Sequence, residues 1–151
     1  MSDNKSMNAV LARRHESIFA SMGQLLDLKV ESEADLLRIG QQGITPKAFK
    51  RVATRLNLPT NLIGPATTIR RRLEANERFS QPESERLLRV VRVYAEASQL
   101  FGDERATKRW MNTAAPFVQG QPAITPIELA ASDSGARLLE ASILRTAHGI
   151  F

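Results

Sequence analysis

The stretch PKAFKRVATRLNLPTNLIGPATTIRRRLEA, residues 46–75, decides the fold that the sequence predicts. It contains two runs with apolar residues at helical spacing, residues 46–58 and residues 65–76, with the turn TNLIG between them. A longer run with the same spacing follows and extends to about Leu100. Two short helices joined by a tight turn and followed by a long packing helix are typical of the helix-turn-helix motif.

The second short helix has two different sides when its residues are placed at 100° per residue. Ala66, Ile69 and Leu73 share one side, which predicts a seam against the preceding helix. The opposite side carries Thr67, Thr68 and Arg71. Arginine pairs bidentately with guanine, and threonine offers thymine a hydroxyl and a methyl group. We therefore expect this side to contact base edges of DNA.

Positive charge is concentrated around this motif. The whole chain carries a formal net charge of +5, whereas residues 47–92 alone hold eleven Lys and Arg against four Glu, a net of +7. This excess predicts an anionic partner. The expected DNA contacts of the second helix are Thr67, Thr68, Arg70, Arg71 and Arg72. The expected phosphate contacts are Lys47, Lys50, Arg51, Arg55 and Arg78.

Two other interpretations of these basic residues stay open. A run of three arginines is also typical of a solvated helix face. Arg86, Arg89 and Arg92 can instead be intramolecular partners, as the i,i+4 spacing of Glu85 and Arg89 indicates.

Helical spacing dominates the rest of the chain, and strand alternation is nearly absent, so we predict an all-α fold. The expected architecture is a helical bundle with a central Xre/Cro-like helix-turn-helix and a small helical C-terminal domain. We divide it into an N-terminal helix (1–30), a helix-turn-helix domain (31–100) and a C-terminal domain (101–151). The apolar stripe of the first helix, from about Asn8 to Asp27, fits either the core or a dimerisation surface. That stripe comprises Val10, Leu11, Ile18, Met22, Leu25 and Leu26.

Capping residues set the expected helix boundaries. Thr45-Pro46 predicts a helix start with a first-turn proline, and Ser80 with Glu83 predicts a capping box. Gly43 is expected to close a helix, and Leu58-Pro59 to stop another. Further starts are predicted at Thr125-Pro126-Glu128 and near Asp133, and a corner at Phe101-Gly102-Asp103.

The composition argues against an enzyme. The chain has no cysteine and only two histidines, His15 and His148, which are far apart and lack ligand-spaced partners. No Gly-rich phosphate loop is present. We therefore expect no catalytic residues, no metal site and no cofactor. The N-terminus lacks the apolar run of a signal peptide, and no run reaches about 20 apolar residues, so we expect a cytoplasmic protein without a membrane partner.

The C-terminal three quarters of the chain resemble a known family. The stretches ERFSQPESERLLRVVRVYAEASQLFGDERATKRWMN (77–112) and ITPIELAASDSGARLLEASILRTAHGIF (124–151) resemble the Xre/MbcA/ParS antitoxins that neutralise RES-domain toxins. The resemblance covers about residues 40–151 and rests on the order of short motifs such as PESERLLR, Phe-Gly and Arg-Trp. The loop FVQGQPAI (117–124) departs from this resemblance, because the family tends to have a glycine followed by a shorter proline-containing segment here.

The resemblance implies a helix-turn-helix that binds the promoter of its own operon and a C-terminal domain that binds the toxin. RES toxins of this kind consume NAD or use it as a source of ADP-ribose, and the antitoxin covers the entrance to the toxin's pocket. The implied toxin contacts are Arg145, His148, Gly149, Ile150 and Phe151.

Three further expectations accompany this interpretation. Because a recognition helix reads a half-site, DNA binding is expected to require a homodimer, with the first helix as the candidate contact. Ile150 can alternatively fold back on its own helix. A different class of function, a stand-alone transcription regulator whose C-terminal domain oligomerises or senses a ligand, also fits the residues.

Overall fold

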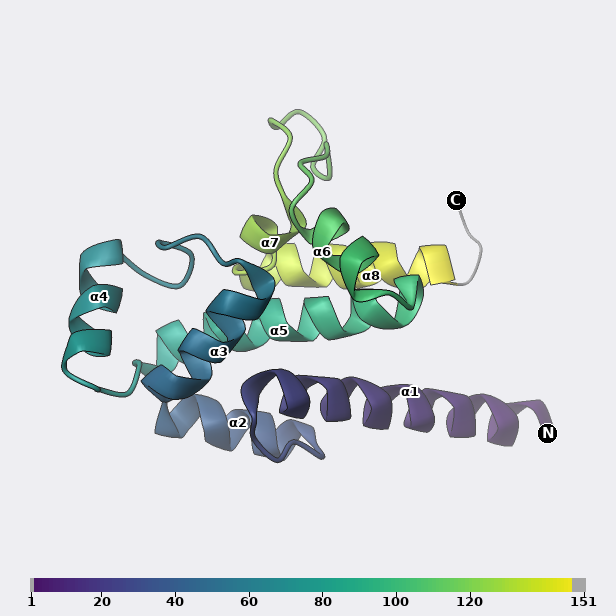
Figure 1. Ribbon diagram of the computed structural model, residues 1–151. Coiled ribbons are helices and arrows are strands. Elements are labelled where there is room, and N and C mark those ends of the chain that lie inside the picture. The colour runs from purple at the N-terminus through teal and green to yellow at the C-terminus, as the bar shows by residue number, and fades with distance from the viewer. Residues whose placement is uncertain (1, 148–151) are drawn as a thin grey trace.

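The computed structural model describes residues 2–147, which form eight helices (Figure 1). The helices are α1 (Ser2–Leu26), α2 (Glu33–Gln42), α3 (Pro46–Leu56), α4 (Ala66–Glu74), α5 (Gln81–Phe101), α6 (Glu104–Met111), α7 (Pro126–Leu129) and α8 (Asp133–Ala147). Within these residues the only β-type pairing is an isolated bridge between Ala115 and Ile124. The all-α prediction is confirmed.

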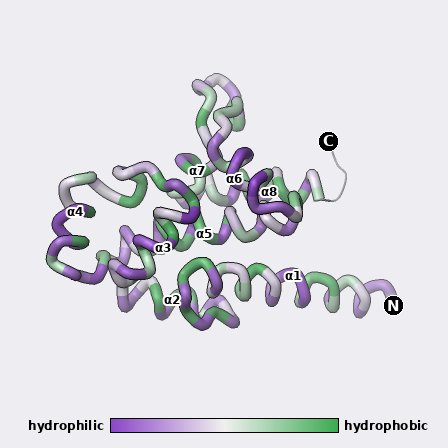
Figure 2. The backbone as a smooth tube through the Cα atoms, in the orientation of Figure 1, coloured by the Kyte–Doolittle hydropathy of each residue, from purple (hydrophilic) through white to green (hydrophobic). Residues whose placement is uncertain are grey.

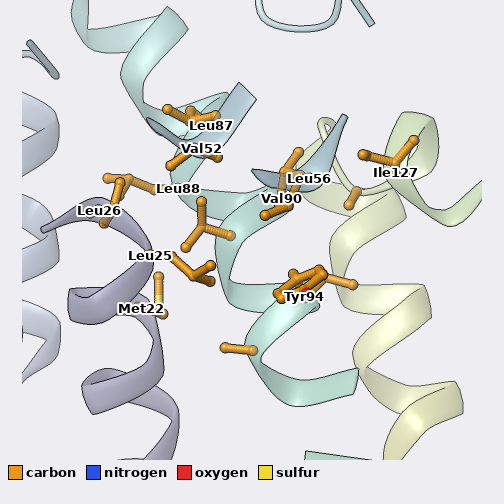
Figure 3. Packing of buried hydrophobic residues seen from close by; sticks show 14 of the residues in the cluster. Met22, Leu25, Leu26, Val52, Leu56, Leu87, Leu88, Val90, Tyr94 and Ile127 are labelled. Atoms are coloured by element: carbon orange, nitrogen blue, oxygen red, sulfur yellow. The ribbon is translucent and has the colours of Figure 1, made fainter. Parts of the chain in front are cut away.

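Helix α5 is the centre of the fold. It runs through the middle of the molecule, with α1 and α2 on one side and α6 and α8 on the other (Figure 1). Side chains of α1, α3 and α7 converge on it, and Figure 3 shows Leu26 of α1 beside Leu88 and Leu56 of α3 beside Val90. Burying a large aliphatic side chain stabilises the folded state by about 1.5–3 kcal/mol.

The buried residues form one cluster that runs from Ile18 in α1 to Ile143 in α8. Each helix contributes through the alternation of apolar and polar residues that Figure 2 shows along the chain. The three segments proposed from the sequence therefore share a core, and their boundaries at residues 30 and 100 stay a prediction.

The predicted caps hold in the structure. Thr45 Oγ1 accepts a hydrogen bond from the Ala48 amide at 3.2 Å. Ser80 and Glu83 form the full capping box, with the Ser80 amide donating to Glu83 Oε1 at 2.8 Å. Gly43 ends α2 with a φ of 87°, and a Cβ there would overlap the carbonyl oxygen of Phe79. One stop differs, because α3 ends at a left-handed Asn57, before the predicted Leu58-Pro59.

Helix α1 is longer than predicted, because it begins at Ser2 and not near Asn8. Its apolar stripe is divided between two environments. The second half, including Met22 and Leu25, is buried in the core. The first half projects past the other helices (Figure 1), and Val10 and Leu11 are 59% and 43% exposed. The core interpretation therefore holds for the second half only.

No helix among residues 2–147 combines the length and the apolar content that crossing a membrane requires.

Candidate nucleic-acid and partner interfaces

Helix α4 lies at the edge of the molecule and faces α3 across an apolar groove (Figure 1). Its predicted seam is present, since Ile69 is buried and Leu73 is half-buried. Phe49 and Ala53 of α3 line the opposite side of the groove. The groove has a volume of about 290 Å³, so α4 does not pack tightly against α3.

Most of the predicted DNA contacts are exposed. Thr67 and Arg71 of α4 are exposed and Thr68 is half-buried; we call these three residues the outer face of α4. Arg70 is also exposed, but it lines the groove toward α3. Lys47 and Lys50 of α3 are also exposed. Within residues 2–147, no salt bridge joins Lys47, Lys50, Arg70 or Arg71 to an acidic side chain. Arg51 differs, because its Nη2 donates to the Gln24 carbonyl of α1 at 3.2 Å.

Arg72 lies apart from the outer face of α4. Its side chain is only 17% exposed, and its Nε lies 2.7 Å from Glu83 Oε1 of α5. Burial opposes ionisation of Glu83, but the Ser80 amide and Arg72 outweigh it and hold the pKa of this carboxyl below its ordinary value. A second, longer contact joins Arg72 Nη1 to Glu77 Oε2 at 3.5 Å. The sequence placed Arg72 among the DNA contacts, whereas the structure pairs it with two acids of its own chain.

Five further arginines of the basic region bind partners within the chain. The interpretation of Arg86, Arg89 and Arg92 as intramolecular partners is confirmed, although Glu85 accepts from Gln81 and not from Arg89. Arg55 and Arg78, expected as phosphate contacts, are engaged in the same way. The acceptors of Arg55, Arg78, Arg86, Arg89 and Arg92 are respectively Glu104, the Gly43 carbonyl, the Ile63 carbonyl, the Ala131 carbonyl and Glu33.

The C-terminal end of α8 carries the one predicted toxin contact that the structure describes. Arg145 is exposed in the last turn of α8. His148, Gly149, Ile150 and Phe151 lie outside the described residues.

A projecting loop stands between α6 and α7 (Figure 1). Two backbone hydrogen bonds of 3.1 Å between Ala115 and Ile124 close its base. Beside it, half-buried Trp110 packs against Phe101 and Phe117, with ring centroids 5.8 and 6.3 Å away. Trp110 thus anchors the loop at the edge of the core.

A groove that the sequence did not predict lies between α1, α5 and α8. It has a volume of about 240 Å³, with apolar walls from Leu11, Phe19 and Leu144. Glu96 and Glu140 also line it, from α5 and α8. Burial and the negative charge of Glu140 raise the pKa of Glu96 to about 7, against the opposing pull of Arg92. Because 44 residues separate the two acids, their helical spacing gave no signal of this contact.

The raised pKa predicts how stability depends on pH. In the folded chain Glu96 titrates at about 7, above its ordinary value of 4.5. The stabilisation from the protonated carboxyl is complete below pH 4.5 and is lost as the pH rises through about 7. We expect Glu96→Gln to raise the free energy of unfolding at pH 8 by about 1–2 kcal/mol, allowing for partial solvent screening, and to change it little at pH 4.

Thermal unfolding across this pH range measures the effect. Glu16→Gln, at an exposed position of α1, is the control and should leave the pH profile unchanged. A profile of Glu96→Gln parallel to that of the wild type would contradict the prediction.

No protein-family profile matches the chain. Two curated proteins named Antitoxin Xre do match parts of it. One, from Pseudomonas putida, is 28% identical over 85 residues, which cover 56% of this chain and 52% of the relative. The other, from Yersinia enterocolitica, is 34% identical over 88 residues, which cover 58% of this chain and 57% of the relative. The chain spans about half the length of these relatives. An all-helical chain with an exposed basic helix is thus a distant relative of curated Xre antitoxins.

Proposed function

We propose that this chain is an antitoxin that binds and inhibits a RES-domain toxin, and that it represses its own operon through α3 and α4. The similarity to two curated Xre antitoxins carries this proposal. In this proposal the chain is a cytoplasmic binding protein and not an enzyme. The toxin would be one that consumes NAD or transfers ADP-ribose from it, and the antitoxin would cover the entrance to its active site.

The DNA-binding part of the proposal rests on α4 and the start of α3. The outer face of α4 presents two threonine hydroxyls and the guanidinium group of Arg71, which are groups that can contact base edges in the major groove. Arg70 adds an exposed guanidinium group beside the groove toward α3. Lys47 and Lys50, exposed on α3, add phosphate contacts that position the helix without reading sequence. Arg51, which is also exposed on α3 and donates to the Gln24 carbonyl, can add a third phosphate contact.

The toxin-binding part rests on the end of α8. Arg145 is exposed there, and residues 148–151 follow it. Two large apolar side chains, Ile150 and Phe151, supply the area that a partner's pocket would bury, at about 25 cal/mol per Å². The resemblance to RES-neutralising antitoxins suggests that these residues bind in the toxin's pocket.

The test of the proposal is growth rescue. Co-expression of this chain should restore the growth of cells that produce the RES-domain protein encoded beside its gene, and the two proteins should purify together. DNA binding without any toxin partner would favour the stand-alone regulator instead.

Replacing Ile150 and Phe151 together with serine should weaken the rescue. If their burial contributes about 3 kcal/mol, affinity for the toxin should fall by about a hundredfold. Calorimetry on the purified pair measures the loss. Ser142→Ala, at a half-buried position of α8, is the control. Full rescue by the double-serine variant would exclude insertion of these two residues.

The dimer that a two-half-site operator requires is proposed to form through the first half of α1. Met7, Val10 and Leu11 form an exposed apolar surface there, and a single projecting helical segment gains stability when a second helix covers it. Leu11→Glu should shift the mass measured by light scattering from dimer to monomer at micromolar concentration, whereas Ala12→Glu should not. A dimer that persists in Leu11→Glu would place the contact elsewhere.

A further inference from the structure

Glu83 is one of three buried polar side chains among the described residues, and it serves two helices at once. Within α5 it completes the capping box, since its Oε1 accepts the Ser80 amide at 2.8 Å. From α4, Arg72 places its Nε 2.7 Å from the same oxygen. Capping requires only an acceptor, which glutamine also supplies. The negative charge is needed for Arg72 alone.

Other contacts hold α4 weakly. Ile69 is the single buried residue of α4, and its N-terminus has no side-chain cap. The apolar groove of about 290 Å³ separates it from α3. One buried residue and the half-buried Leu73 fix the rotation of a short helix about its own axis only weakly, and each step of one residue changes the direction of a side chain by 100°. A second fixed point is therefore needed to set which side of α4 faces outward.

We propose that Glu83 is a positioning residue for DNA binding. Its ion pair with Arg72 fixes the rotation of α4 and so directs Thr67 and Arg71 outward. The consecutive arginines Arg71 and Arg72 then have separate roles, with the second as the anchor for the first. This inference rests on the proposed DNA-binding function.

The decisive variant is Glu83→Gln, which keeps the size of the side chain and its capping acceptor but removes the charge. Glu85→Gln is the matched control, because it makes the same change two residues later on α5, where Glu85 accepts a hydrogen bond from Gln81 and, among residues 2–147, forms no salt bridge. Amide hydrogen exchange across residues 66–74 reports the mobility of α4 without DNA. Binding to the DNA upstream of the gene and to calf-thymus DNA reports affinity and sequence preference.

We expect Glu83→Gln to speed exchange in residues 66–74 by about tenfold or more, because it leaves the half-buried Arg72 with only its longer contact to Glu77, at 3.5 Å. Preference for the upstream DNA over calf-thymus DNA should fall by about tenfold, while binding to calf-thymus DNA persists through Lys47 and Lys50. Glu85→Gln should match the wild type in both measurements. Arg72→Met should speed exchange like Glu83→Gln, and the double variant should add little.

The direction in which Glu83→Gln changes DNA binding distinguishes a positioning role from the simple loss of a negative charge. Removing an acidic charge near a DNA-binding surface would by itself strengthen binding, whereas loss of positioning weakens the sequence-specific part. Unchanged exchange in residues 66–74, or a preference equal to or above that of the wild type, would overturn the inference. If the wild type itself shows no preference for the upstream DNA, the proposed DNA-binding function fails, and the positioning role fails with it.

Discussion

Replacing Gly135 with alanine should lower the free energy of unfolding by about 3 kcal/mol, the largest single-residue effect on stability that we expect here. A Cβ at this position would overlap the carbonyl oxygen of Leu129, and the Ser132 hydroxyl is also close. The obstructing oxygen of Leu129 belongs to the backbone, so no side-chain rotation relieves the overlap. The first turn of α8 would have to move, although Leu139 and Ile143 hold this helix in the core.

Urea denaturation of the purified chain measures this loss, and Gly120→Ala is the matched control. Gly120 lies in the projecting loop with a φ of 78° and has no atom within 4 Å of its Cβ position. Alanine there costs backbone strain alone, about 1 kcal/mol. Equal losses in the two variants would show that α8 can yield at Gly135, contrary to our expectation.

Replacing Arg71 with alanine should remove most of the sequence preference in DNA binding. The Arg71 side chain is exposed on the outer face of α4 and forms no salt bridge within the described residues. A bidentate contact with guanine contributes about 1–3 kcal/mol of discrimination, which corresponds to a loss of roughly five- to 150-fold at the contacted position. Fluorescence anisotropy on the upstream DNA and on variants with single base changes measures it.

Lys50→Ala provides the contrast for this measurement. As a phosphate contact, Lys50 should contribute affinity on every sequence, so its loss should weaken binding by a similar factor on all DNAs. An Arg71→Ala variant that behaves like Lys50→Ala would assign Arg71 to the backbone and not to the bases.

The sequence predicted most helix boundaries because their signals are local. Thr45, Ser80 and Thr125 each cap a helix through an amide three residues later, and that spacing is readable in the printed chain. The start of α1 was missed because Met7 is the only apolar residue in Ser2–Met7, so no apolar stripe marks this first part of the helix. The end of α3 was placed two residues late, because the left-handed conformation of Asn57 precedes the proline that served as the signal.

The candidate site was less predictable, because its key contacts join residues that are distant in sequence. Helical spacing correctly placed Ile69 toward α3 and Arg71 outward. It could not show that Arg72 pairs with Glu83, since the crossing of α4 and α5 decides that contact. The charge excess of residues 47–92 was likewise a poor measure of a binding surface, because a chain's own carbonyls and carboxylates engage many of its arginines.

The central position of α5 couples the stability of the two ends of the chain. Because α8 packs on the same helix as α1 and α2, a ligand that binds only the folded α8 surface stabilises the entire cooperative unit. A ligand at one hundred times its dissociation constant adds about 2.7 kcal/mol, which lowers the unfolded population roughly a hundredfold. Proteolysis that acts on the unfolded form would then be slower for the bound chain than for the free one. A partner bound to α8 would thus protect α1 and α2 from proteolysis without touching either helix.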